Sequence, residues 1–137
     1  METAIIVPTL AILVMGASDL AMGFSEKLKL QQAAARTVEM ATAGGLNSDA
    51  FQNLKAEGAS AAGVPTESVT LDTWLECDGV RQSSFDITCG DGEQVARFVS
   101  IDISGSYTPM FSFLVPSSRT TDNGGFALTG YSSVRVQ

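Results

Sequence analysis

The feature that most constrains the fold of this chain is a long apolar run close to its N-terminus. From Ala4 to Phe24 the sequence reads AIIVPTLAILVMGASDLAMGF, and Asp19 carries the only formal charge within it. At the α-helical rise of about 1.5 Å per residue, this run spans about 30 Å, which is the thickness of the hydrocarbon core of a bilayer. We therefore expect a helix that crosses a membrane or is buried among other helices.

The flanks of the run bear on its topology. A secretory signal peptide begins with a basic segment, whereas only Met1 and Glu2 precede this run. Lys27 and Lys29 follow it, which by the positive-inside rule places the rest of the chain in the cytoplasm. The cysteines discussed below indicate an oxidising compartment instead. Either a basic cytoplasmic leader has been removed before Met1, which we favour, or the lysine bias is simply weak.

Two residues inside the run suggest that it packs against protein. A carboxylate at membrane depth costs a few kcal/mol on insertion scales, so Asp19 either lies hydrated near the far interface or pairs with a basic group of a neighbouring subunit. Pro8 has no backbone N–H and is expected to kink a helix or open its first turn. Glu2 invites similar pairing, for example with a terminal amine. Glu2, Pro8 and Asp19 are therefore our candidate assembly residues.

Beyond the run, the pattern remains helical to the glycine pair at 44–45, which supplies a stop. One continuous helix of about forty residues is expected, with residues 1–24 as an apolar segment and residues 25–43 as an amphipathic half. The spacing of three and four predicts an inward face of Leu28, Gln31, Ala35, Val38 and Thr42. A shorter helix is expected over 48–62, with Phe51, Leu54 and Ala61 facing inward.

The apolar period changes to two after residue 68, which is typical of β-strands. Four segments show it, namely 69–77, 85–89, 99–107 and 126–136. Each would have one apolar face, and the amphipathic half of the long helix is available to cover that face. The predicted fold is α+β: a long N-terminal helix on a small antiparallel sheet of about four strands (68–137), within a globular domain of residues 25–137.

The two cysteines of the chain fall at positions 77 and 89. We interpret Cys77 and Cys89 as a structural disulfide, because redox pairs typically use Cys-x-x-Cys at a helix N-terminus. The acidic residues near this hairpin have no spacing that we associate with a calcium loop, and a solvated hairpin end is the favoured interpretation. They are Asp78, Asp86, Asp91 and Glu93.

Composition excludes several classes of function. The formal charge of −7 leaves no basic surface for phosphates, so no nucleic-acid partner is expected. The absence of histidine excludes Ser-His-Asp and Cys-His catalysis and histidine-ligated zinc. No paired carboxylates with a catalytic spacing stand out either. We expect no enzyme activity, no cofactor and no metal.

The order of these elements resembles type IV pilins in the broad sense. More specifically, the segments 16–23 (GASDLAMG) and 30–36 (LQQAAAR) are similar to elements of the TadE-type proteins of tight-adherence pili. In the C-terminal half, the resemblance continues through the two cysteines, Phe98-Val99-Ser100-Ile101, Tyr107-Thr108-Pro109 and the closing SVRVQ of residues 133–137. The resemblance covers essentially the whole chain, and its specificity lies in the order and spacing of these elements.

This resemblance implies a minor pilin or pseudopilin. A prepilin peptidase would remove a leader, the product would sit in the bacterial inner membrane with its domain outside, and assembly machinery would draw it into a surface filament of itself or other pilins. By family analogy Glu2 docks on a neighbour's terminal amine, although the family places that residue about five positions in. A membrane-anchored extracytoplasmic binding or adhesion module, using loops within 107–125, is the alternative.

Overall fold

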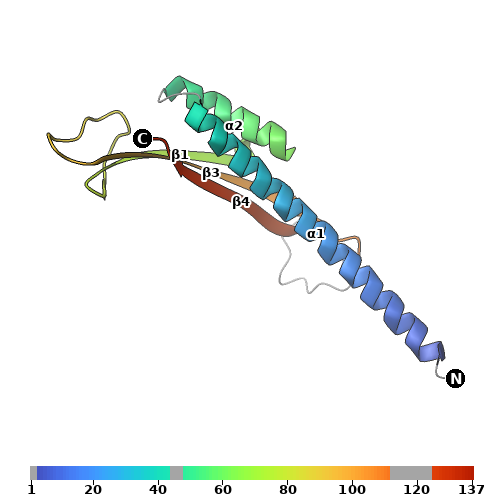
Figure 1. Ribbon diagram of the computed structural model, residues 1–137. Coiled ribbons are helices and arrows are strands. Elements are labelled where there is room, and N and C mark those ends of the chain that lie inside the picture. The colour runs from blue at the N-terminus through green and yellow to red at the C-terminus, as the bar shows by residue number, and fades with distance from the viewer. Residues whose placement is uncertain (1–2, 44–47, 112–124) are drawn as a thin grey trace.

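The computed structural model describes residues 3–43, 48–111 and 125–137. A single long helix lies across one face of a curled four-stranded sheet, and a second helix packs beside it (Figure 1). In chain order the elements are α1 (Thr3–Ala43), α2 (Ser48–Ala62), the 3-10 turn η1 (Thr66–Ser68), β1 (Val69–Cys77), β2 (Val80–Arg81), β3 (Val95–Tyr107) and β4 (Phe126–Arg135). The predicted α+β fold with one long N-terminal helix is confirmed.

The sheet is antiparallel throughout, with the strand order β2-β1-β3-β4. Its central pair runs from Val69 opposite Ile103 to Cys77 opposite Val95. β1 turns into β2 through Asp78 and Gly79, which both have positive φ (49° and 79°), as the mirror-image turns of two-residue hairpins require. Among the described residues β4 pairs with β3 alone, and its other edge faces α1.

The core lies between the inner face of the sheet and the C-terminal half of α1. The most deeply buried large side chains are those of Val69, Leu75, Val99, Ile101 and Ile103, as the alternation predicts. The helix meets them mainly with small residues, and this lets its backbone approach β4 closely. A Cβ at Gly130 would lie 2.4 Å from the Leu30 carbonyl carbon and oxygen, so only glycine fits there.

Val38 of α1 is buried as predicted, but the rest of the predicted inward face is wrong in phase. The buried residues are Leu30, Ala33, Ala34, Thr37, Val38 and Ala41, whereas Leu28, Gln31 and Thr42 are exposed and Ala35 is half-buried. The physical reason is the close contact at Gly130, which selects the alanine-rich stripe over the face that carries Leu28. In α2, Phe51 and Leu54 are buried as predicted, but Ala62 takes the inward place expected for Ala61.

The strand predicted over 85–89 does not form. β2 at Val80–Arg81 continues β1 for only two residue pairs, and the chain then runs as a loop. The Phe85 ring instead packs edge-on against Phe51 with a centroid distance of 5.6 Å, and its carbonyl accepts a hydrogen bond from Arg97 Nε. These contacts, together with the disulfide at Cys89, hold the segment over the core without a strand partner.

Candidate functional site

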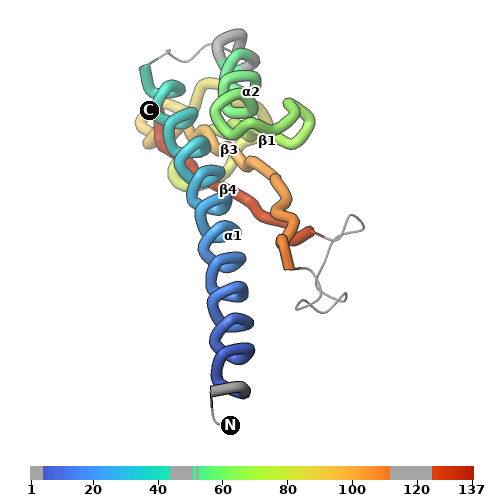
Figure 2. The backbone as a smooth tube through the Cα atoms, turned by 90° about the vertical axis from the view of Figure 1, so that its right-hand side faces the viewer, coloured from blue at the N-terminus to red at the C-terminus, as the bar shows by residue number. Residues whose placement is uncertain are grey.

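The N-terminal half of α1 extends beyond the domain as a free helix (Figures 1 and 2). Its large apolar side chains are exposed, among them Ile5 at 74%, Leu13 at 63% and Leu20 at 77% of their full surface. Within the described chain, α1 is the one helix long and apolar enough to cross a membrane, judged by length and composition. This apolar surface of about 30 Å must be covered by something other than its own domain in water.

Of the candidate assembly residues, Pro8 lies within this free helix and α1 continues through it. The Thr9 hydroxyl donates to the Ile5 carbonyl at 2.9 Å, a local bond within the same turn. Glu2 lies outside the described residues.

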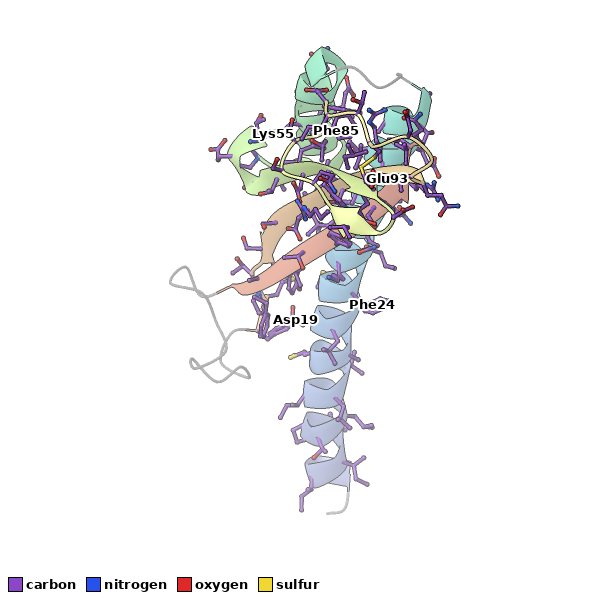
Figure 3. All side chains as sticks on the ribbon, turned by 90° about the vertical axis from the view of Figure 1, so that its left-hand side faces the viewer. Asp19, Phe24, Lys55, Phe85 and Glu93 are labelled. Carbon is purple, nitrogen blue, oxygen red and sulfur yellow. A yellow bond between two sulfur atoms is a disulfide. The ribbon has the colours of Figure 1, made fainter. Side chains whose placement is uncertain are left out.

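Asp19 is the third candidate. Its carboxylate lies where the free helix contacts the end of β3 (Figure 3). Oδ1 accepts hydrogen bonds from the Tyr107 hydroxyl and the Met110 backbone N–H, and Oδ2 accepts one from the Phe111 N–H, each at 2.9 Å. The sequence left hydration or a neighbour's cation as the two options for Asp19. In the structure its donors come from its own chain.

These donors belong to a short corner where the chain leaves β3, which we call the 107–111 corner. Tyr107 ends β3, and its ring lies against Gly23, where a Cβ would come within 3.2 Å of the ring. Burial, and then the hydrogen bond to Asp19, raise the pKa of the Tyr107 phenol. The backbone N–H groups of Met110 and Phe111 are thus both satisfied by one side chain of the helix.

A groove with a volume of about 910 Å³ lies beside this corner, between α1 on one side and the end of β3 and the start of β4 on the other. Its walls are mostly apolar. On the helix side they include Ile12, Leu13, Ala17 and Leu20, and on the sheet side Pro109, Phe111, Phe126 and Leu128. Asp19 and Lys27 are its charged residues, and each has hydrogen-bond partners within the chain.

Two polar side chains of α1 also satisfy the free edge of β4. Lys27 Nζ donates to the Thr129 carbonyl. One turn further along, Gln31 Nε2 donates to the Tyr131 carbonyl at 2.7 Å, and Gln31 Oε1 accepts from the Tyr131 N–H at 3.4 Å. The Gln31 amide thereby takes the place of a neighbouring strand, which blocks this part of an edge that could otherwise pair with another chain.

Cys77 and Cys89 form the predicted disulfide, with their Cα atoms 5.6 Å apart. Two of the four hairpin acids accept hydrogen bonds from the backbone: Asp78 Oδ1 from the Gln94 N–H at 2.8 Å, and Glu93 Oε2 from the Gly90 N–H at 2.7 Å. In the described part of the chain, the only cluster with metal-ligand spacing is these two cysteines with Glu93. A disulfide has no thiolate to offer a metal, so this cluster is structural.

Asp19 was predicted as a site residue from the sequence, but its partners, and the contacts of Lys27 and Gln31 with β4, were not. Backbone N–H groups leave no trace in a sequence, so the bonds from Met110 and Phe111 could not be predicted. The spacing of four between Lys27 and Gln31 places both on one helix face and was the available clue. No protein-family model, curated protein or solved structure matches this chain.

Proposed function

We propose that this protein is a membrane-anchored structural subunit of a bacterial surface filament or pilus assembly, of the TadE-like pilin or pseudopilin kind, that polymerises through the free half of α1. The observation that carries the proposal is the free half itself. From Ile5 to Leu20 the large apolar side chains are exposed, and the helix projects away from the domain (Figure 2). In a lone membrane anchor, only lipid would cover this apolar surface. In a filament subunit, lipid would cover it before assembly and the helices of other copies would cover it afterwards.

The arrangement of the domain agrees with this use. α1 continues without a break from the free half into the covered half, so force applied to one is transmitted to the other. The bonds of Lys27 and Gln31 to β4 hold the domain on the helix, and the disulfide ties the loop that ends at Cys89 to β1 within the domain. The motifs shared with TadE-type proteins add the expectation of an inner-membrane precursor, a prepilin peptidase and assembly machinery as partners.

A matched pair of charge substitutions tests this function. Leu10 is 54% exposed in the free half, and Met40 is 47% exposed in the covered half. Leu10→Asp is expected to abolish fibres in material sheared from cells, because each subunit would bury an unpaired carboxylate among helices. Met40→Asp, with similar exposure on the domain side, should leave fibres intact.

The alternative is a membrane-anchored binding module. Such a protein would extract into detergent as a discrete monomer or small oligomer, and cells producing it would show no fibres. Fibre formation that survives Leu10→Asp would contradict polymerisation through this half of α1. Glu2→Ala tests the docking role implied by the resemblance, since it should impair assembly while leaving the domain folded.

A further inference from the structure

We propose that the 107–111 corner is a second membrane-contact surface, which lies in the lipid near the bilayer interface beside α1. The proposal rests on the membrane-anchored state in the proposed function and does not depend on filament formation. Its occupant is the lipid bilayer, whose acyl chains would also fill the groove between the corner and α1.

The length of the apolar stretch places the corner at the edge of the bilayer. The apolar stretch is bounded by two acids, Glu2 and Asp19, and the residues between them, 3–18, span only about 24 Å as a helix. The hydrocarbon core is about 30 Å thick. An α1 that spans it therefore brings the hydrocarbon boundary about one turn beyond residue 18. The 107–111 corner is hydrogen-bonded to the helix at this level, through Asp19.

The charge at the corner and two of its backbone N–H groups already have partners within the protein. In lipid, every backbone N–H and every charge needs a partner within the protein. The Asp19 carboxylate and the N–H groups of Met110 and Phe111 satisfy one another, together with the Tyr107 hydroxyl. Lys27 likewise satisfies the Thr129 carbonyl on the groove wall.

The residues of the corner are also apolar enough to contact lipid. The corner carries no charged side chain, and Met110 stands 70% exposed at its tip. The groove behind it is walled by Phe111, Phe126 and Leu128 and is continuous with the exposed helix face of Leu13 and Leu20. A tyrosine and a proline beside these apolar groups suit the interface region, where aromatic residues are enriched. Lys27 is the first basic residue of α1. It lies about 12 Å beyond Asp19 along the helix, on the headgroup side.

Quenching by brominated lipids tests this placement with the full-length protein in phosphatidylcholine vesicles. Bromine quenches tryptophan only at short range, so it reports contact with the labelled part of the acyl chain. The native Trp74 is the single tryptophan. It pairs with Phe98, nine residues from Tyr107 along β3, or about 30 Å from the corner, and serves as the reference outside the membrane.

Two variants in a Trp74→Phe background place the probe. Met110→Trp tests the corner, and its high exposure makes the substitution compatible with folding. Leu10→Trp, in the free half of α1, is the control for insertion. We expect Leu10→Trp to be quenched most by bromines deep in the chain and Met110→Trp most by bromines near the carbonyl end, while Trp74 of the unmodified protein keeps nearly all its emission.

Quenching of Leu10→Trp without quenching of Met110→Trp would overturn the proposal and leave the membrane anchor intact. In that same outcome, an unquenched Met110→Trp emission that is shifted to the blue would mean that a second copy, and not lipid, covers the corner. No quenching of Leu10→Trp would show that α1 is not inserted, which would refute the anchored state and this proposal with it.

Discussion

Gly130→Ala is the substitution for which the structure predicts the clearest effect. A Cβ at this position would lie 2.4 Å from the carbonyl carbon and oxygen of Leu30 and 2.8 Å from the Gln31 nitrogen. Ordinary contacts between carbon atoms lie at about 3.5–4.0 Å. Because the obstacle is helix backbone and not a movable side chain, α1 would have to withdraw from β4 by more than about 1 Å.

The cost can be bounded from this geometry. Overpacking in a well-packed core costs about 1–3 kcal/mol, and a clash with backbone belongs at the upper end. The withdrawal also strains the Gln31–Tyr131 hydrogen bonds next to the contact, each contributing about 1 kcal/mol. We expect the free energy of unfolding to fall by at least about 3 kcal/mol, a large part of the 5–15 kcal/mol typical of a domain.

Urea unfolding of the full chain in detergent, followed by Trp74 fluorescence, measures this. Gly105→Ala is the matched control, because its Cβ would meet only the Leu30 side chain, at 3.0 Å, and that side chain can rotate. We expect it to lower stability by about 1 kcal/mol or less. Equal effects of the two substitutions would refute the claim that helix backbone lies directly on Gly130.

Three further predictions concern the contacts that fix α1 and the hairpin. Gln31→Ala should lower the unfolding free energy by about 1–3 kcal/mol, because two polar groups of β4 lose their partner. The control Gln32→Ala, at an exposed position, should change it by no more than about 0.5 kcal/mol. Equal effects of the two substitutions would contradict the role of Gln31 at the edge of β4. The double variant Cys77→Ser/Cys89→Ser should lose about 3 kcal/mol in the same urea experiment, and an unchanged midpoint would show that the bridge does not constrain the unfolded chain. Burial and the bond to Asp19 raise the pKa of Tyr107, so its contribution to stability is present below the ordinary tyrosine value of about 10 and is lost as the pH rises through the higher folded value. An absorbance titration should accordingly show a late tyrosinate step that Tyr107→Phe removes, and persistence of that step in the variant would contradict the assignment.

Much of the fold could be predicted because its signals are local. The apolar run and the glycine pair at 44–45 indicated the length of α1, and alternation indicated β1, β3 and β4, although β3 begins at Val95, four residues before its predicted start. The segment 85–89 shows the limit of that argument. Its alternation is real, but a strand needs a partner, and here the chain is held by Cys89 and by the contacts of Phe85.

The inward face of α1 could not be read from hydropathy alone. Leu28 is more apolar than alanine, yet Ala33 and Ala34 are buried because small side chains allow the backbone to reach Gly130. Asp19 was noticed as an unusual charge, but its partners include two backbone N–H groups some ninety residues away along the chain. Such contacts depend on the folded path of the chain and not on residue type.

We propose that the free half of α1 is buried among other copies in a filament. A helical reconstruction by electron microscopy of fibres sheared from cells that produce this protein tests it most directly. We predict fibres whose core consists of packed helices assigned to residues 5–18, with the sheet domains outside. Fibres that leave this segment exposed, or purified protein that stays as discrete detergent-soluble monomers with no fibres on the cells, would contradict the claim.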